Sequence, residues 1–273
     1  TACRRQRQMC IRDSTFICFI TVFTQKRHWD KRVKVKHLGK SNKQFLKPHF
    51  SILDSIKRYN AAKSIHGVDI WNAYEFYYLD HNFKPIHFPL ELEFPSQSKY
   101  TVESKSLKLY LNSFYKYKAK SNLEIFKKIQ TDIFKVCKIQ IKISELKYNF
   151  LTQKNTRLKK YKEQSNSNNY FFFDGFRSVC PVTNQPDFGK IYFKTSNKKI
   201  PSEEIFNYLF SFQEHNAFHE TCIEEIYHQF ESHFLLQNLI VIGKFMRRGG
   251  ISINPIRSFK PISKSMIFHE QYQ

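Results

Sequence analysis

Cys180 and Asp187, within the segment CPVTNQPDFG of residues 180–189, are two residues of this sequence that could do chemistry together. A cysteine thiolate is a nucleophile and an aspartic acid can donate a proton, so one short loop offers both functions. Its two prolines and Asn184 disfavour a helix and favour an extended or turned backbone. The segment runs into Ile191-Tyr192-Phe193, which is typical of a strand. The sequence therefore predicts Cys180 at the lip of a sheet, although a small buried cysteine near a loop aspartate is the commoner arrangement.

Three further strings accompany this segment. They are FHETC at residues 218–222, RRGGISINP at 247–255 and ESKSLKLYLNSF at 103–114. Together with the cysteine and the aspartate, these strings resemble the QueF family of nitrile reductases, which convert 7-cyano-7-deazaguanine to the 7-aminomethyl base in queuosine biosynthesis, a tRNA modification. The resemblance runs from about Leu38 to Ser258, most of the chain. It implies an NADPH-dependent nitrile oxidoreductase.

The resemblance implies covalent catalysis at Cys180. A nitrile carbon is electrophilic but reacts poorly with hydride, so adding a thiolate first creates a thioimide, whose C=N bond a nicotinamide can reduce. Asp187 would supply a proton to the developing nitrogen anion as a general acid. NADPH, acting twice as a co-substrate, would then bring the product to the primary amine without a metal or a flavin.

Recognition of the base is implied for five residues. A deazaguanine presents N–H and amino donors on its pyrimidine edge, and a buried carboxylate can accept them in bidentate fashion. Judged alone, Glu103 would more commonly be a solvated acid at a helix start, and His219 and Glu220 an ordinary loop before a helix. By resemblance, the residues that bind the substrate are Val102, Glu103, Ser104, His219 and Glu220.

The cofactor phosphates call for a site other than a Rossmann turn. The chain has 7 glycines and no GxGxxG motif, which argues against a Rossmann dinucleotide site. An arginine suits the 2′-phosphate of NADPH through forked hydrogen bonds, and a glycine lets the backbone approach a ligand. Without the resemblance, residues 247–250 would be only a charged turn. The resemblance assigns NADPH binding to Ser104, Lys105, Arg248 and Gly249.

A repeat indicates which elements position these residues. YLNSF at residues 110–114 and YLFSF at 208–212 lie 98 residues apart, and each closes a helical stripe with i, i+3, i+4, i+7 spacing. A second amphipathic helix follows in each copy, which favours duplication. The apolar positions are Leu107, Tyr110, Leu111 and Phe114, then Ile125, Ile129 and Ile133 in the first copy, and Ile205, Tyr208, Leu209 and Phe212, then Ile223, Tyr227 and Phe230 in the second.

Strands surround both helix pairs. Residues 70–79 and 86–94 predict two strands joined through a turn at residues 80–82. The alternating isoleucines of residues 139–143 predict a strand after the first helix pair, and the apolar run 239–242 predicts one after the second. The pattern indicates an α+β fold. The resemblance specifies tandem tunnelling-fold (T-fold) modules, each an antiparallel sheet with a helix pair, as in GTP cyclohydrolase I and pyruvoyl-tetrahydropterin synthase.

Four segments are expected along the chain. Residues 1–36 are a basic tail that matches nothing in the family and is expected to be disordered or extraneous. Residues 37–151 form an N-terminal module with the ESKS motif, and residues 170–273 form a C-terminal module with the Cys/Asp loop. Residues 152–169, rich in Lys, Gln, Asn and Ser, read as a linker. Since each module carries part of the motif set, one complete site needs both.

The charge of the chain is strongly positive but unevenly distributed. Lys and Arg number 45 against 23 Asp and Glu, a net charge of +22, which by itself suggests a polyanionic partner. Residues 1–50, however, hold 13 Lys and Arg and 2 Asp, so +11 lies in the first fifth. The rest is spread out, and we expect that no direct nucleic-acid partner is required. A hydrophobic content of 41% is enough for a real core.

Cysteine usage favours the cytoplasm. The six cysteines form no CxxC pair and no dense disulfide framework. The apolar run 15–23 follows several arginines like a signal peptide, but nine residues cannot span a bilayer, so no membrane association is expected. The resemblance implies a homodimer. The cysteines are Cys3, Cys10, Cys18, Cys137, Cys180 and Cys222.

No metal site is expected. HExxH is absent, and His219 with Cys222 has no second pair at zinc-binding spacing, so Cys222 is expected to pack on its helix. Two other functions stay open. A pterin-type lyase or cyclohydrolase on the same fold would need zinc ligands. A basic RNA-binding protein derived from a dead enzyme would keep its function without Cys180.

Overall fold

The computed structural model describes residues 36–37, 44–58, 65–162, 164–165, 169–271 and 273. The chain divides into two compact units, Thr1–Val33 and Lys34–Gln273. The first unit lies outside the described residues. The expectations for the basic tail, the apolar run 15–23 and the three cysteines within it therefore stay predictions.

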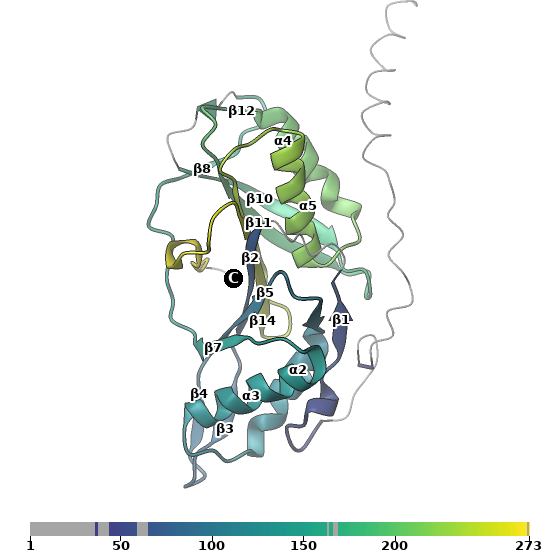
Figure 1. The fold of residues 1–273 in the computed structure, drawn as a ribbon, viewed down its shortest axis with the longest axis vertical. Helices are drawn as coiled ribbons and strands as arrows, with labels where there is room; N and C mark the ends of the chain where they lie inside the picture. The colour runs from purple at the N-terminus through teal and green to yellow at the C-terminus, as the bar shows by residue number, and fades with distance from the viewer. Residues whose placement is uncertain (1–35, 38–43, 59–64, 163, 166–168, 272) are drawn as a thin grey trace, which may run out of the picture. The chain divides into compact units, whose positions relative to one another are not determined.

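A single large sheet carries strands from both halves of the chain (Figure 1). Neighbouring strands are antiparallel, except β8 and β10, which are parallel. Helices and a largely antiparallel sheet together confirm the α+β class. Within the described residues the strands are, in sheet order, β7 (Lys142–Glu145), β5 (Leu90–Pro95), β2 (His66–Ala73), β14 (Ile251–Ser258), β13 (Ile240–Phe245), β11 (Pro186–Lys194), β10 (Tyr170–Val179) and β8 (Asn155–Arg157).

Strand β14 joins the two halves. All eight of its residues pair with β2, from Ile251 opposite Ala73 to Ser258 opposite His66. On its other edge β14 pairs with β13 of its own half. The last long strand of the chain therefore lies against the first, and the two halves share one continuous sheet.

The strands predicted at residues 70–79 and 86–94 are each divided in the structure. Their outer parts, β2 and β5, belong to the large sheet, whereas β3 (Tyr77–Leu79) and β4 (Pro85–His87) form a separate hairpin. The Asp80 carboxylate closes this hairpin by accepting from the backbone N–H groups of Asn82 and Lys84, both at 2.8 Å. The predicted turn at residues 80–82 is confirmed.

The repeated helices are confirmed with their spacing. Helix α2 (Ser104–Asn112) and the 3₁₀ helix η2 (Ser113–Lys116) recur 98 positions later as α4 (Ser202–Phe210) and η3 (Ser211–Glu214). The second helices are α3 (Asn122–Cys137) and α5 (His219–Ser232). Of the predicted stripe positions, all but the partly exposed Tyr208 are buried. Local periodicity alone therefore identified both helix pairs.

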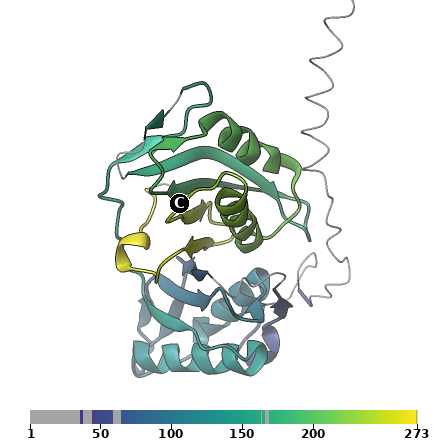
Figure 2. The same ribbon diagram turned by 45° about the horizontal axis from the view of Figure 1, so that its top comes forward.

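Both helix pairs pack on the same face of the sheet, at opposite ends of the strand order (Figures 1 and 2). Helices α2 and α3 cover Trp71 of β2 and Ile253 of β14, and α4 and α5 cover Val241 of β13. The register of β13 and β14 places these side chains on one side. The other side holds a third apolar cluster, which Met266 and Phe268 of the C-terminal segment complete.

The predicted linker contains regular structure. Strand β8 extends the large sheet beside β10, and β9 (Gln164–Ser165) pairs with β12 (Lys199–Ile200). Reading residues 152–169 as a loop missed these strands because they pair through their backbones and carry few apolar side chains. The division into two modules with a linker stays a proposal. The remaining elements are β1 (Ser55–Lys57), which pairs with β6 (Tyr100–Val102), and the 3₁₀ helices η1 (Phe50–Ile52) and η4 (Lys264–Met266).

Candidate active site

Cys180 lies where β10 ends, in a six-residue turn that leads into β11. Its backbone N–H donates to the Gln185 carbonyl at 2.8 Å, and its carbonyl accepts from the Asn184 N–H at 3.0 Å. Asn184 takes φ of 55°, a left-handed conformation that asparagine tolerates better than most residues. The predicted position at the lip of a sheet is confirmed. Cys180 is a free and partly exposed thiol, so a small electrophile can reach it.

Asp187 lies in strand β11 and not on the loop with Cys180, which corrects that expectation. It is paired opposite Ser178 of β10, and its side chain is 6% exposed. By strand alternation, Asp187 shares a face with Ile191 and Phe193, which pack against α5 and its neighbours. A strand fixes the direction of the carboxylate more firmly than a loop would.

His219 and Arg248 both contact the Asp187 carboxylate. Nε2 of His219, the first residue of α5, lies 3.3 Å from Asp187 Oδ2, and Arg248 Nη1 lies 2.7 Å from Oδ1. The imidazole stacks on the Phe245 ring, with centroids 4.0 Å apart and planes 12° apart. Arg248 also donates to the Pro186 carbonyl at 3.0 Å. Three predicted site residues, assigned separately to catalysis, substrate and cofactor, therefore form one contact group.

This contact group can move a proton. Oδ2 of Asp187 faces Nε2 of the His219 imidazole, a ring nitrogen that can carry a proton, while Oδ1 is held by the Arg248 guanidinium. The Phe245 ring limits rotation of the His219 ring. A proton given up by Asp187 can therefore be replaced from His219 without a change of backbone.

Glu220 is buried beside a network of ion pairs. Arg58 Nη2 lies 2.6 Å from Asp69 Oδ2, and Arg257 Nη1 lies 2.7 Å from Asp69 Oδ1. Arg257 also reaches Glu224 of α5 at 3.5 Å. Burial raises the pKa of the Glu220 carboxyl, and the Asp69 charge adds to this, while Arg58 opposes it. Glu220 is thus poorly hydrated, a state in which a matching donor edge gains most from pairing with it.

Glu103 is buried at the start of α2 and not solvated, with 1% of its surface exposed. It is the N-cap of α2, because Oε1 accepts from the Lys105 N–H at 2.8 Å and Oε2 from the Ser106 N–H at 2.7 Å. The Ser104 hydroxyl donates to Oε1 at 3.3 Å. Burial raises the pKa of Glu103, although these hydrogen bonds oppose the rise. Val102, the last residue of β6, is buried next to it.

The predicted residues fall into a first-half group, residues 102–105, and a second-half group around Asp187. Among the described residues, no hydrogen bond or ion pair joins Glu103 or Ser104 to Cys180, Asp187 or His219. Strand β1 connects the groups. The Glu103 N–H donates to the Asp54 carbonyl at 2.9 Å, and β1 leads from Asp54 to Arg58 beside Glu220. At about 3.3 Å per residue, this path spans roughly 13 Å.

The turn at Arg248 and Gly249 has the form of a cradle for an anionic cofactor. Gly249 and Gly250 take positive φ, 56° and 80°, which favours glycine. A Cβ atom at Gly249 would lie 2.4 Å from Lys108 Nζ, so the missing side chain brings α2 and this turn together. Lys105 and the exposed hydroxyl of Ser104 lie on the first turn of the same helix. Cations and open backbone at one place fit the phosphates of NADPH.

Sequence reasoning missed the buried charges Arg58, Asp69 and Arg257. Asp69 and Arg257 lie in the mostly buried strands β2 and β14, and Arg58 directly follows β1. The signal available in the sequence was a charged residue at an inward position, such as Asp69 two residues before the buried Trp71. Cys222, in contrast, is buried in the core of its half as expected.

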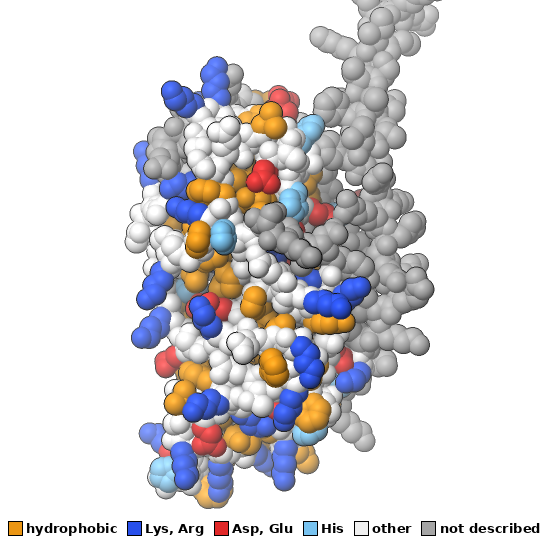
Figure 3. Space-filling view, in the orientation of Figure 1, with side chains coloured by type: hydrophobic (Ala, Val, Ile, Leu, Met, Phe, Trp, Pro, Cys, Tyr) orange, Lys and Arg blue, Asp and Glu red, His pale blue; other side chains and the backbone are white. Residues whose placement is uncertain are grey.

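In the part of the chain that the structure describes, no group of three or more His, Cys, Asp or Glu side chains is placed to hold a metal ion. Within the same residues, no helix combines the length and the apolar character that crossing a bilayer requires. On the face shown in Figure 3, Lys and Arg side chains are interspersed with apolar and uncharged ones and do not form a single stripe.

Comparison with known proteins gives consistent matches in both halves. A family profile described as "Nitrile reductase, 7-cyano-7-deazaguanine-reductase N-term" matches residues 48–145, and one described as "QueF-like protein" matches residues 186–263. A protein of Desulfotalea psychrophila named NADPH-dependent 7-cyano-7-deazaguanine reductase is 31% identical over 215 residues, 70% of this chain and 78% of its own length. A protein of the same name from Buchnera aphidicola is 34% identical over 215 residues, 70% of this chain and 82% of its own length.

Proposed function

The chain belongs to the QueF family of nitrile reductases, and from this premise we propose that it reduces the nitrile of 7-cyano-7-deazaguanine to the 7-aminomethyl base with NADPH. The product is a precursor in queuosine biosynthesis. One observation carries the proposal within the structure. The partly exposed thiol of Cys180 lies in the turn of the β10–β11 hairpin. The second strand of this hairpin, β11, carries Asp187, whose carboxylate contacts His219.

Cys180 is the nucleophile in this proposal. Its thiolate adds to the nitrile carbon and forms a thioimide, and the nitrile nitrogen takes a proton from Asp187. His219, at 3.3 Å from Asp187, replaces that proton. When bound, NADPH supplies the two electrons of each reduction as a hydride. After the first reduction the thiol leaves, and the second reduction gives the amine, so one amine requires two NADPH.

The two buried carboxylates read the base. Glu103 and Glu220 each have acceptor capacity left for the N–H and amino donors of the pyrimidine edge, since a carboxylate offers about four lone-pair positions. Val102, Ser104 and His219 are proposed to line the same site. Because the carboxylates come from different halves of the chain, the substrate has to lie between them.

NADPH is proposed to bind at the start of α2 and at the glycine turn. Arg248 and Lys105 supply positive charge, Ser104 supplies a hydroxyl, and Gly249 exposes its backbone. Arg248 is 41% exposed in its side chain, so a phosphate can reach its guanidinium from solvent while the contact with Asp187 persists.

We propose further that the enzyme works in the cytoplasm as a homodimer. A thiol nucleophile has to stay reduced, and Cys137, Cys180 and Cys222 are free. Strands β7 and β8 end the sheet in the described residues and offer edges for a second copy. Light scattering on the purified protein measures its mass in solution and so tests the dimer. A monomeric mass together with full activity would exclude it.

The reaction is tested by mixing purified protein with 7-cyano-7-deazaguanine and following the loss of NADPH absorbance. Mass spectrometry counts the amine formed, and Cys180→Ala is run beside the wild type. We expect two NADPH consumed for each amine and no turnover in the variant. Substrate binding without any turnover by the wild-type protein would refute the proposed reaction.

A further inference from the structure

Five charged side chains lie together, almost completely buried, where α5 packs on β2 and β14. They are Arg58, Asp69, Glu220, Glu224 and Arg257. With all five charged, three carboxylates face two guanidiniums, which leaves one negative charge uncompensated. An excess charge inside a protein is met by a proton or by a ligand. The group therefore has a place for one of these.

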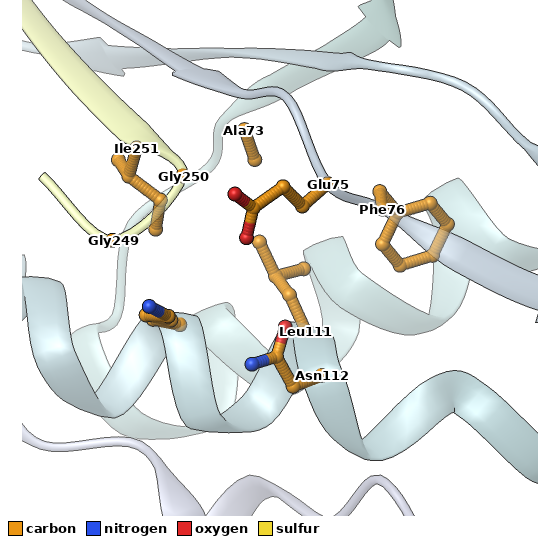
Figure 4. Close-up of a pocket in the computed structure, with 9 residues that line it drawn as sticks. Ala73, Glu75, Phe76, Leu111, Asn112, Gly249, Gly250 and Ile251 are labelled. Carbon is orange, nitrogen blue, oxygen red and sulfur yellow. The ribbon is translucent and has the colours of Figure 1, made fainter. Parts of the chain in front are cut away.

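Two acids near β2 show what burial requires. Glu75 follows the strand and is exposed, and in Figure 4 its carboxylate points into an open hollow beside the Gly249–Gly250 turn, where water can hydrate it. Asp69, six residues earlier, is fully buried and is paired with two arginines. Buried ion pairs add little net stability, because the cost of desolvation offsets the attraction. The network is therefore better explained by its effect on Glu220 than by stability.

Asp69 fixes the direction of both arginines. Arg257 lies opposite Gly67 in the register of β14 and β2, and a Cβ atom at Gly67 would lie 2.9 Å from Arg257 Cδ, so the glycine makes room for the side chain. Arg58 directly follows β1, and its Nε donates to the Ser98 hydroxyl at 3.1 Å while its Nη2 lies 2.6 Å from Asp69. Each guanidinium is thus held from two sides.

Glu220 is the acid that this network leaves without a direct partner. It lies one helical turn before Glu224 on α5, so the two carboxylates are on one face of the helix. Arg257 reaches Glu224 at 3.5 Å, whereas no ion pair with a described residue includes Glu220. Arg58 is therefore the arginine that remains for Glu220.

The groups that face Glu220 act in opposite directions. Burial raises the pKa of its carboxyl, and the Asp69 charge raises it further. Arg58 after β1, and His219 on α5 itself when protonated, lower it. The carboxylate is thus close to a cation but not bonded to it, which leaves its oxygens available to accept from a ligand.

We infer that Arg58 is a positioning residue for substrate binding: held by Asp69, it keeps the Glu220 carboxylate charged and its oxygens available for the N–H and amino donors of the base. The inference rests on the proposed function and deepens it, because it assigns a role to a residue that contacts neither substrate nor cofactor. Without Arg58, Glu220 would bind a proton at higher pH and lose an acceptor for the base.

The experiment measures the affinity for 7-cyano-7-deazaguanine by calorimetry from pH 5 to 9, on the full chain carrying Cys180→Ala so that no covalent bond forms. In this background, Arg58→Gln keeps an amide donor for Asp69 but removes the charge. We expect the pH at which half of the affinity is lost to rise by about 1 unit, which is roughly tenfold weaker binding on the acid side. Affinity should recover towards that of the parent protein at the alkaline end.

Three further variants separate charge from structure. Arg58→Lys keeps the charge and should retain most of the parent pH profile. Asp69→Asn removes the acid that opposes Glu220, so its midpoint should move down, opposite to that of Arg58→Gln. Arg157→Gln is the matched control and should leave the profile unchanged, because Arg157 also pairs with an aspartate, Asp174 at 3.8 Å, but is 65% exposed in its side chain.

A double variant tests whether Arg58 acts through Glu220. Once Glu220→Gln has removed the titrating group, adding Arg58→Gln should move the pH midpoint no further. A merely structural role for Arg58 would instead weaken binding equally at every pH and by the same factor with and without Glu220→Gln. Circular dichroism checks that each variant is folded. Should Arg58→Gln fail to fold, Asp69→Asn decides, because a midpoint that does not move down would overturn the inference.

An Arg58→Gln protein with the parent pH profile, or with an equal loss of affinity at all pH values, would also overturn the inference. Turnover is measured separately on chains that keep Cys180. A wild-type protein that reduces the nitrile, with a binding profile that ignores Arg58, refutes this inference alone. A binding profile that follows Arg58, in a protein that never reduces the nitrile, refutes the proposed reaction alone.

Discussion

The helix starts of the two halves differ although the helices themselves repeat. Helix α2 is capped by the buried carboxylate of Glu103, while α4, 98 positions later, follows Pro201 and has no side-chain cap. The second helices show the reverse. Ser121 caps α3 in the ordinary way, whereas α5 has no side-chain cap and opens on His219 and the buried Glu220.

In each half, therefore, one helix start carries a buried carboxylate of the proposed site, at α2 and α5, and the other, at α3 and α4, does not. A helix start is suited to this because its first N–H groups are not bonded within the helix and its dipole favours an acid. Glu103 satisfies two of those groups, and Glu220 lies in the first turn of α5. The comparison teaches that the proposed site takes one carboxylate from each half and from helix starts that do not correspond, since Glu103 begins the first helix of its pair and Glu220 the second of its pair.

The largest expected effect tests whether the proton donor of the reaction lies in the second half of the chain. Asp187→Asn removes the proposed proton donor but keeps the shape of the side chain, so kcat should fall about 10²- to 10⁴-fold with KM changed little. Steady-state kinetics with both substrates measures this. Asp174→Asn, on the partner strand β10 and exposed, is the control and should behave as the wild type. An equal loss in both variants would mean that the hairpin, not the acid, was damaged.

The next effect tests whether the first half reads the substrate. Glu103→Gln should raise the KM for the nitrile about 10- to 100-fold with a smaller change in kcat, because hydrogen bonds to a charged acceptor are lost. The matched control is Glu203→Gln, an exposed acid in the first turn of α4. A Glu103→Gln protein with unchanged KM would show that Glu103 serves only as a helix cap.

A third prediction asks which carboxylate sets the acid limit of substrate binding. The pKa of Glu220 is raised by burial, and accepting the N–H donors requires the charged form. Affinity should therefore be full above this raised pKa and be lost as the pH falls through it, at higher pH than for an ordinary carboxyl near 4.5. Calorimetry on Cys180→Ala protein from pH 5 to 8 measures this loss of substrate affinity at acid pH. Adding Glu220→Gln should weaken binding and make the affinity depend less on pH.

The same measurement also distinguishes whether protonation of Glu103 or of Glu220 weakens substrate binding. The pKa of Glu103 is also raised. If the pH dependence of affinity is unchanged in the Cys180→Ala, Glu220→Gln protein, the group whose protonation weakens binding is therefore Glu103. Affinity that does not fall toward acid pH in the Cys180→Ala protein would show that neither carboxylate needs its charge for binding.

The smallest effect concerns the ordinary helix starts. Ser121→Ala removes the hydroxyl that accepts from the Glu124 N–H at 3.3 Å, which should lower the free energy of unfolding by about 1 kcal/mol and leave kcat unchanged. Pro201→Ala, where no such bond exists, should change stability less. Urea unfolding monitored by circular dichroism measures both. A loss of activity in Ser121→Ala would bring α3 into the site and weaken the comparison.

Much of the fold could be predicted because its signals are local. The stripes that run from α2 into η2 and from α4 into η3 are four apolar residues within eight positions, and such spacing is decided by neighbouring helical turns. The division of residues 70–79 into β2 and β3 could not be predicted, because the whole run is apolar or aromatic enough for a strand. The pairing of β14 with β2 has no local signal, since the partners lie far apart in the sequence.

The site was predicted as a set of residues but not as an arrangement. The turn residues around Cys180 indicated its place at the lip of a sheet through proline and asparagine conformations, which are local properties. That Arg248 contacts Asp187 depends on where two distant turns meet. Glu103 was expected to be solvated without the family resemblance, because the sequence does not show that β1 and β6 cover it.

The pairing of β14 with β2 also has a consequence for the newly made chain. Tyr74 and Ser252, which share a hydrogen bond at the end of this pair, are 178 residues apart. At a synthesis rate of roughly 5–20 residues per second, β2 waits about 10–40 s for its partner to leave the ribosome. Until then, a buried apolar strand presents an open edge, which is a template for aggregation. Synthesis of this protein is therefore expected to depend on chaperones that shield the first half.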